Sequence, residues 1–187
     1  MSKIIFLDRD GVINKYPGDK KYVTSWEEFK FIRGSLTAIK KLTEADYKIF
    51  IVSNQAGVSK GLYSKKHLDV ITKNMLKRIE QSGGKIQDIQ YCLHKEEEDC
   101  SCRKPKPGLV NKILNKLKKI NNKSAIYIVG DDIRDIKTGI NAKLRTILVL
   151  SGRERFENRK KWQVRPNYIF RNLLDAANFV IDNNGVK

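Results

Sequence analysis

Short apolar segments alternate with amphipathic segments along almost the whole chain, and this alternation most constrains the fold. Segments rich in Ile, Val, Phe and Tyr predict strands at 3–8, 48–53, 86–93, 125–130, 145–150 and 168–170. Apolar residues at helical spacing predict helices at 34–46, 64–82, 107–119, 133–142 and 172–182. Strands and helices in alternation predict βαβ crossovers and a mostly parallel sheet covered on both faces. The expected fold class is α/β, a Rossmann-like three-layer sandwich.

Length and composition indicate a single globular domain over residues 1–187. Of the 187 residues, 40% are hydrophobic and 32% are charged, which argues against a disordered chain. No apolar run reaches the ~18 residues that a membrane span needs, and Met1-Ser2-Lys3 leads directly into the first strand without a secretory signal. We therefore expect a cytoplasmic protein without a membrane partner, as a monomer, whose three cysteines form no structural disulfide.

The net charge of +17 leaves two interpretations open. A strongly basic chain attracts anionic partners such as phosphorylated metabolites or nucleic acid. The same charge also results when lysines cover the solvent faces of helices, as they do over residues 111–119. Residues 151–166 are basic as well, and we expect them to form a basic helix.

Polar residues follow several of the predicted strands, at the point where each strand ends. The first strand leads into Asp8-Arg9-Asp10-Gly11, the second into Ser53-Asn54-Gln55-Ala56-Gly57 and the fourth into Gly130-Asp131-Asp132. Lys104 lies between the third strand and the helix that follows it. Parallel sheets bind ligands beyond the carboxyl ends of their strands, so we expect these groups to converge on one site.

The residue types at this edge suit phosphate and a divalent cation, although each has a structural alternative. Paired carboxylates can bind a hard cation and leave an oxygen free to attack an electrophile. Ser53 and Asn54 provide donors for phosphate, or they form an ordinary turn. Lys104 provides a point charge for phosphate, or it is a surface lysine. Asp131 completes a cation's oxygen shell, or it belongs with Asp132 to the start of a helix.

The four motifs resemble, in order and spacing, those of the haloacid dehalogenase-like phosphatase superfamily. The resemblance spans nearly the whole chain. The longer strings are similar to the branch of D,D-heptose 1,7-bisphosphate phosphatases and histidinol-phosphatases. These strings are residues 6–14 (FLDRDGVIN), 53–57 (SNQAG) and 102–108 (CRKPKPG).

The resemblance implies a phosphoric monoester hydrolase that works through an aspartyl-phosphate. Asp8 would be the nucleophile, and Asp10 would be the general acid and then the general base. Mg²⁺ would be bound by Asp8, by the backbone carbonyl of Asp10 and by Asp131. The groups that would bind phosphate or substrate are Ser53, Asn54, Arg103 and Lys104.

One position departs from the resembled branch, which often carries a lysine directly after the acid of its fourth motif. Here this residue is Asp132. The substitution leaves open whether Asp132 or Asp135 assists the metal. We expect Asp131 to bind Mg²⁺ directly and Asp135 to support it from outside the ligand shell.

A second constellation lies in residues 92–102, where Cys92, His94, Cys100 and Cys102 form two pairs with one residue inside each. Four such ligands in one short loop suit tetrahedral Zn²⁺, and no position is left for water, so the site is expected to be structural. The spacing resembles the zinc loop of the heptose-bisphosphate phosphatases. Chance placement of a histidine and three thiols is the alternative.

Too few residues separate the motifs for a large cap domain, so we expect an open site roofed by residues 14–31 and by the zinc loop. Tyr16, Tyr22 and Trp26 in the first of these loops either contact substrate or pack on the domain edge. The resemblance favours a small phosphorylated sugar as substrate, D-glycero-D-manno-heptose 1,7-bisphosphate, converted to the 1-phosphate. The alternatives are histidinol phosphate or another small phosphomonoester, a nucleic-acid 3′-phosphate and, without catalysis, a nucleic-acid-binding module.

Overall fold

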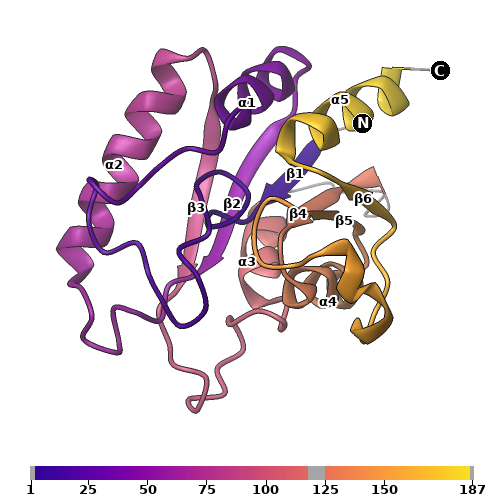
Figure 1. Ribbon diagram of the computed structural model, residues 1–187. Coiled ribbons are helices and arrows are strands. Elements are labelled where there is room, and N and C mark those ends of the chain that lie inside the picture. The colour runs from indigo at the N-terminus through magenta and orange to yellow at the C-terminus, as the bar shows by residue number, and fades with distance from the viewer. Residues whose placement is uncertain (1–2, 118–124, 186–187) are drawn as a thin grey trace.

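The structure, a computed structural model, describes residues 3–117 and 125–185, and a six-stranded sheet lies at its centre (Figure 1). The strands are β1 (Ile4–Leu7), β2 (Lys48–Asn54), β3 (Ile86–Cys92), β4 (Tyr127–Gly130), β5 (Arg145–Val149) and β6 (Tyr168–Phe170). All neighbouring strands are parallel, in the order β3-β2-β1-β4-β5-β6. The strand order reverses its direction between β1 and β4, and doubly wound sheets bind ligands at such a switch point.

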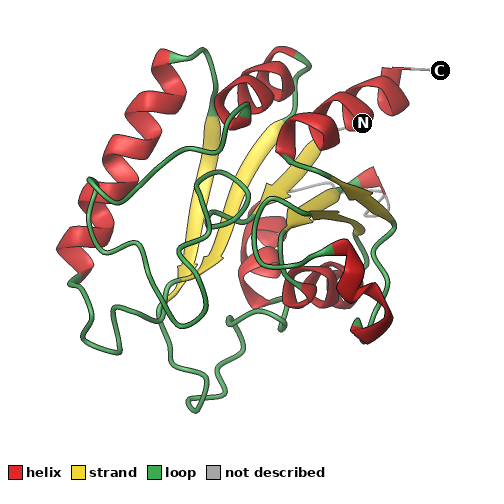
Figure 2. Cartoon of the chain, in the orientation of Figure 1, coloured by secondary structure: helices red, strands yellow, loops and turns green. Residues whose placement is uncertain are grey.

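Helices cover both faces of the sheet (Figure 2). Helices α1 (Ser35–Glu44), α2 (Lys65–Gln81) and α5 (Leu173–Gly185) pack on one face. Helices α3 (Gly108–Lys116) and α4 (Ile133–Ala142) lie on the other. The prediction of a three-layer α/β sandwich is confirmed.

Alternation along the strands produces the two cores. In β1, Ile5 and Leu7 belong to the core beneath α1, α2 and α5, whereas Ile4 and Phe6 belong to the core on the opposite face. All four side chains are at most 1% exposed. A strand that is buried on both faces explains why the segment is apolar throughout rather than alternating with polar residues. This burial fixes the end of β1, and therefore the position of residue 8.

Most predicted boundaries agree with the structure to within a few residues. Helix α4 spans the predicted 133–142, and Ser64 caps the amino end of α2 by accepting a hydrogen bond from the His67 backbone. Residues 118–119, which were predicted to belong to α3, lie outside the described part of the chain. The expected basic helix over 151–166 is wrong for most of its length, because only Phe156–Lys161 are helical there, as a 3-10 helix.

The segment between β1 and α1 forms a compact loop, and no helix lies between residues 8 and 34. Trp26 stacks on Phe29 with ring centroids 5.2 Å apart and packs against the core, so the interpretation that it packs on the domain edge is confirmed. Tyr16 and Tyr22 instead line the large pocket at the carboxyl edge of the sheet. Among the described helices, none combines the length and apolar character needed to cross a membrane.

Candidate active site and metal centre

The carboxylate of Asp8 follows β1 directly and lies at the switch point of the sheet. Its backbone N–H donates to the carbonyl of Val129 in β4, at 2.9 Å. One carboxylate oxygen, Oδ1, accepts a hydrogen bond of 2.7 Å from the Arg9 backbone. The side chain is 13% exposed. Asp8 is therefore held rigidly but can still be reached from the pocket.

Lys104 brings a buried positive charge to Asp8. Its ammonium nitrogen lies 2.9 Å from Asp8 Oδ2, 2.6 Å from Asp135 Oδ1 and 3.0 Å from the carbonyl oxygen of Val52. Burial opposes the charge, yet Asp135 and Asp8 raise the pKa of Lys104 above its ordinary value. The alternative of a surface lysine is wrong, because only 4% of this residue is exposed.

The side-chain amide of Asn54 binds the backbone of Lys104. Its side-chain amide donates to the Lys104 carbonyl, and its side-chain oxygen accepts from the Lys104 N–H, both at 3.1 Å. These paired bonds connect the end of β2 to the loop that follows β3. Ser53 is 2% exposed and lines the same pocket.

Asp131 is enclosed between two glycines. A Cβ atom added to Gly11 would lie 2.1 Å from Asp131 Oδ2, and one added to Gly152 would lie 1.9 Å from the same oxygen. That oxygen accepts a 2.7 Å hydrogen bond from the backbone N–H of Arg153. Burial, together with the charges of Asp8 and Asp135, raises the pKa of Asp131 well above its usual value.

Asp132 and Asp135 cap the start of α4, and for Asp132 this is the position that the structural interpretation expected. Asp132 accepts from the Arg134 backbone at 2.8 Å, and Asp135 accepts from the Asp132 backbone at 3.2 Å. Hydrogen bonds from Arg134 and the charges of Arg134 and Arg153 overcome burial and lower the pKa of Asp132 to about 2. Burial raises the pKa of Asp135 to about 7, with the Asp8 charge adding to it and Lys104 opposing it.

Three carboxylates form a group that fits a divalent cation. Oxygen atoms of Asp8, Asp131 and Asp135 all lie within 4.8 Å of one another. Burial and the closeness of like charges both disfavour ionisation of these acids, and the raised pKa values of Asp131 and Asp135 reflect the two causes together. A hard cation with oxygen ligands relieves this repulsion. Asp132 points to Arg134 and Arg153 instead, with its Oδ2 2.7 and 3.0 Å from their guanidinium nitrogens.

Asp10 is surrounded by hydrogen-bond donors. The guanidinium group of Arg9 contacts both of its carboxylate oxygens at 3.0–3.2 Å. Asn14 donates to Oδ1 at 2.8 Å, and Gln55 donates to Oδ2 at 2.9 Å. The carboxylate is therefore fixed in position, with 20% of its side chain exposed.

The carboxylates of Asp8, Asp10, Asp131, Asp132 and Asp135 line a pocket of about 890 Å³, together with Ser53, Asn54 and Lys104. Many of the other residues that line this pocket are basic, and they form its basic rim. Arg103 lies on this rim, 3.9 Å from Glu96, and donates to the carbonyl of His94 at 3.3 Å. The other basic residues that line the pocket are Lys20, Lys21, Lys60, Arg134, Lys137, Arg153 and Lys161. An anionic ligand with more than one charged group suits such a rim.

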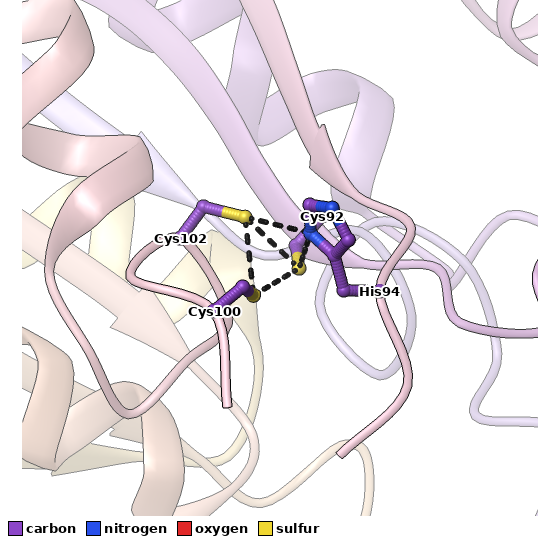
Figure 3. Close-up of side chains that lie close together, drawn as sticks. All are labelled: Cys92, His94, Cys100 and Cys102. Carbon is purple, nitrogen blue, oxygen red and sulfur yellow. Dashed lines mark hydrogen bonds between the residues drawn. The ribbon is translucent and has the colours of Figure 1, made fainter. Parts of the chain in front are cut away.

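Cys92, His94, Cys100 and Cys102 converge at the end of β3 (Figure 3). The five ligand-atom pairs that make contact are 3.2–3.7 Å apart. Disulfide sulfurs lie about 2.05 Å apart, so these thiols are free, whereas tetrahedral zinc with Zn–S bonds of about 2.3 Å spaces its ligands by about 3.5–3.8 Å. The cluster therefore fits a tetrahedral metal.

The four residues differ in burial, with Cys100 and Cys102 intermediate, and the pKa of one thiol is lowered. Cys92 is buried and His94 is exposed. Although burial opposes it, hydrogen bonds from Cys102 and from the Arg103 backbone lower the pKa of Cys100 to about 7. The thiolate is the form that binds metals.

The sequence interpretation missed the loop after β5 and the residues that contact Asp10. Ser151 donates to the Gly11 carbonyl at 2.7 Å, and Arg153 contacts Asp131 and Asp132. The signal was present, because Ser151-Gly152-Arg153 follows a strand just as the recognised motifs do. Gln55 stood within a quoted motif, yet it was assigned no role.

Comparisons with known proteins agree with this geometry. The family model described as HAD-hydrolase-like matches residues 101–176. The D-glycero-β-D-manno-heptose-1,7-bisphosphate 7-phosphatase of Pasteurella multocida is 34% identical, over 96% of this chain and 97% of that protein. The α-anomer 7-phosphatase of Campylobacter jejuni is also 34% identical, over 95% of each chain.

A solved structure has the same fold. The D,D-heptose 1,7-bisphosphate phosphatase of B. bronchiseptica, complexed with magnesium and phosphate, superimposes with a TM-score of 0.89. It is 31% identical, and the match covers 97% of this chain and 99% of that one. The chain therefore belongs to the haloacid dehalogenase-like phosphatases, in the family of these heptose-bisphosphate phosphatases, and is a phosphoric monoester hydrolase.

Proposed function

We propose that this protein removes the 7-phosphate of D-glycero-D-manno-heptose 1,7-bisphosphate and leaves the 1-phosphate. The observation that carries the proposal is the contact between Asp8 and buried Lys104 at the floor of a basic pocket. Relatives named for this reaction match nearly the whole chain. A substrate with two phosphates places one at Asp8 and leaves the second for the basic rim. Relatives are named for both anomers, so the anomer preferred here is a question for experiment.

The reaction follows from the placement of two carboxylates. An oxygen of Asp8 attacks phosphorus, and the bond from phosphorus to the oxygen on C7 breaks as the aspartyl-phosphate forms. Asp10 gives a proton to the leaving oxygen. Water then attacks the phosphorus of the intermediate, Asp10 takes its proton, and inorganic phosphate and free Asp8 are released.

The remaining side chains stabilise the transferring group. Lys104 places its charge beside Asp8 Oδ2, where the phosphoryl oxygens arrive, and Asn54 holds the backbone of that lysine. Ser53 contributes a hydroxyl on the same side of the pocket. Arg103 on the rim is placed for the second phosphate, because a planar guanidinium suits paired oxygens.

Magnesium fits the group of Asp8, Asp131 and Asp135. We propose that Asp8, Asp131 and the backbone carbonyl of Asp10 hold the ion. Asp135 supports them from outside the ligand shell, because its two oxygens already face Lys104 and the Asp132 backbone. When bound, the ion would screen the repulsion between the attacking carboxylate and the phosphate.

We further propose that the cluster of Cys92, His94, Cys100 and Cys102 binds structural zinc. All four ligands come from the protein, so no position remains for a reacting water. Lys104 follows Cys102 by two residues, and the loop that connects the cluster to α3 carries Arg103 and Lys104 into the pocket. Metal binding would therefore fix the loop that positions both cations.

A substrate panel with Mg²⁺ tests the proposed function. Both anomers of the heptose bisphosphate, histidinol phosphate and a 3′-phosphorylated oligonucleotide are compared by kcat/KM. We expect one heptose anomer to give the highest value. Preference for the oligonucleotide, favoured by the basic rim, would overturn the proposed substrate.

A matched pair of variants tests the proposed chemistry. Asp8→Asn should abolish phosphate release while the fold remains intact. Asp175→Asn, which removes a carboxylate of α5 paired with exposed Arg171, should keep normal activity. Normal turnover by folded, metal-loaded Asp8→Asn protein would refute the mechanism.

A further inference from the structure

A buried amide lies behind the acid–base residue, in the motif that follows β2, and has been assigned no role so far. Gln55 follows β2 and is fully buried. Its side-chain nitrogen donates to Asp10 Oδ2 at 2.9 Å and to the hydroxyl oxygen of Ser53 at 3.2 Å. One amide thus contacts both the proton-transfer residue and a phosphate-side residue.

Tyr63 fixes the orientation of this amide. Its hydroxyl donates to the side-chain oxygen of Gln55 at 2.6 Å. A carboxylate can only accept hydrogen bonds, so the amide must turn its NH₂ group toward Asp10 and its oxygen toward Tyr63. With the hydroxyl of Tyr63 in place, this is the orientation in which both ends of Gln55 are paired.

A close approach of the backbone lets Tyr63 reach this position. A Cβ atom on Gly57 would lie 2.3 Å from Tyr63 Cε1, so any side chain at residue 57 would displace the ring. Tyr63 is 6% exposed and also lies beside Tyr22, with ring centroids 6.4 Å apart. Because the ring is enclosed on these sides, Tyr63 is a rigid support for Gln55.

Every partner of Asp10 in this network is a donor. Arg9 and Asn14 donate to the carboxylate alongside Gln55, and the Arg9 guanidinium is fully buried. Donors on both carboxylate oxygens hold the Asp10 side chain in one orientation in the pocket that it lines.

We propose that Gln55, oriented by Tyr63, is a positioning residue that holds Asp10 for the hydrolysis of the aspartyl-phosphate. In that step water forms a bond to phosphorus, the bond from phosphorus to Asp8 breaks, and the proton of the water passes to Asp10. The inference rests on the proposed function, because it requires the phosphorylated intermediate. It assigns Gln55 to the step in which Asp10 acts as a base.

The two halves of the reaction can be measured separately with p-nitrophenyl phosphate in a rapid-quench experiment. Nitrophenolate is a good leaving group and needs little help from an acid, so its burst reports formation of the phosphoenzyme. The decay of acid-trapped phosphoenzyme after substrate is removed reports hydrolysis. For Gln55→Glu, which replaces the donor with a second acceptor, we expect decay to be roughly 10- to 100-fold slower and the burst rate to stay within about threefold.

Tyr63→Phe is the milder variant and removes only the hydroxyl that orients Gln55. It should slow decay in the same direction by roughly tenfold or less. Its control is Tyr47→Phe, which removes another buried hydroxyl, one that donates to the carbonyl of Val180 under α5 at 3.0 Å. Tyr47→Phe should leave both rates unchanged.

The outcomes separate the inference from the proposed function. Parallel slowing of the burst and the decay in Gln55→Glu and Tyr63→Phe, or no change in either rate, would overturn the inference, because a general distortion of the site slows both steps. Failure of the wild-type protein to form any phosphoenzyme would instead refute the proposed mechanism, and the inference with it.

Discussion

The ammonium nitrogen of Lys104 lies 2.9 Å from the carboxylate of Asp8, although two strands and two helices separate the two residues in the sequence. Lys104 is held there by Asn54 through its backbone and by Asp135 through its side chain. A buried cation beside the attacking carboxylate pre-orders the site for phosphate. The position of one lysine therefore connects the ends of β1 and β2 to the first turn of α4.

Replacing this lysine should affect chemistry more than folding when metal is present. We expect Lys104→Met to lower kcat/KM by about 10²- to 10³-fold, because a donor to the transferring oxygens is lost. Lys106→Met is the matched control. Lys106 lies two residues after Lys104 and pairs with exposed Asp99. Steady-state kinetics in saturating Mg²⁺ measure the effect, and equal losses in the two variants would contradict it.

The carboxylate group predicts an unusual pH dependence for the magnesium-free protein. Burial and like charges raise the pKa of Asp135 to about 7 and that of Asp131 well above its usual value. Unfolded aspartate titrates near pH ~3.9, so the folded protein binds more protons between about pH 4 and pH 7. Through these groups, stability is greatest near pH 4 and declines as the pH rises to about 7. Added Mg²⁺ should therefore raise the melting temperature more at pH 8 than at pH 5.

The variant Asp135→Asn separates this effect from the rest of the protein. It removes one raised pKa, so the melting temperature of the magnesium-free protein should fall less steeply between pH 4.5 and pH 7. Asp175→Asn should leave the slope unchanged. The buffers should contain no chelator, because chelation would also strip metal from the cysteine cluster. A melting temperature of Asp135→Asn that falls as steeply as that of the wild type would contradict the assignment.

The sequence was sufficient for the sheet and for the residues that follow its strands. Apolar segments bounded by charges located β1 and β4, and the rule that carboxyl ends converge brought Asp8, Asp131 and Lys104 together. Arg9 could not be placed in this way, because an arginine is normally exposed and here it is fully buried against Asp10. Its contacts with Asp10 arise because the side chain folds back over the next residue. The hydrophobic periodicity of a sequence does not reveal such a contact.

The loop after β5 was missed for a different reason. Its many arginines and lysines suggested a basic helix, and the strand-end rule was not applied to the residues after the fifth strand. In the structure, the backbone of this loop contacts Asp131, because Gly152 allows close approach and the Arg153 N–H donates to the carboxylate. Contacts made by backbone groups depend little on residue type, so the sequence indicates them only through the glycine.

Gly152 should therefore tolerate no side chain. In Gly152→Ala the new methyl group would overlap the carboxylate of Asp131, so either the loop or the metal ligand must move. We expect the apparent affinity for Mg²⁺ to fall by roughly 10- to 100-fold, with kcat at saturating metal reduced less. Mg²⁺ titration of activity measures this. The control is Gly83→Ala, just after α2, where the only cost is the left-handed φ of 85°. This variant should leave the Mg²⁺ affinity unchanged. A loss of affinity as large as that of Gly152→Ala would contradict the prediction.

We expect the cysteine cluster to support the active site through the loop that carries Lys104. Cys100→Ser removes a ligand whose sulfur lies 3.4–3.6 Å from its two neighbours, so bound zinc should drop below one per chain and the melting temperature should fall. Because the loop that leaves the cluster carries Arg103 and Lys104, kcat/KM should fall as well. Ser101→Ala, between the two thiols in sequence, should change none of these quantities. Metal analysis by mass spectrometry measures the stoichiometry, and a variant that keeps full zinc content would show that the four residues do not act together as ligands.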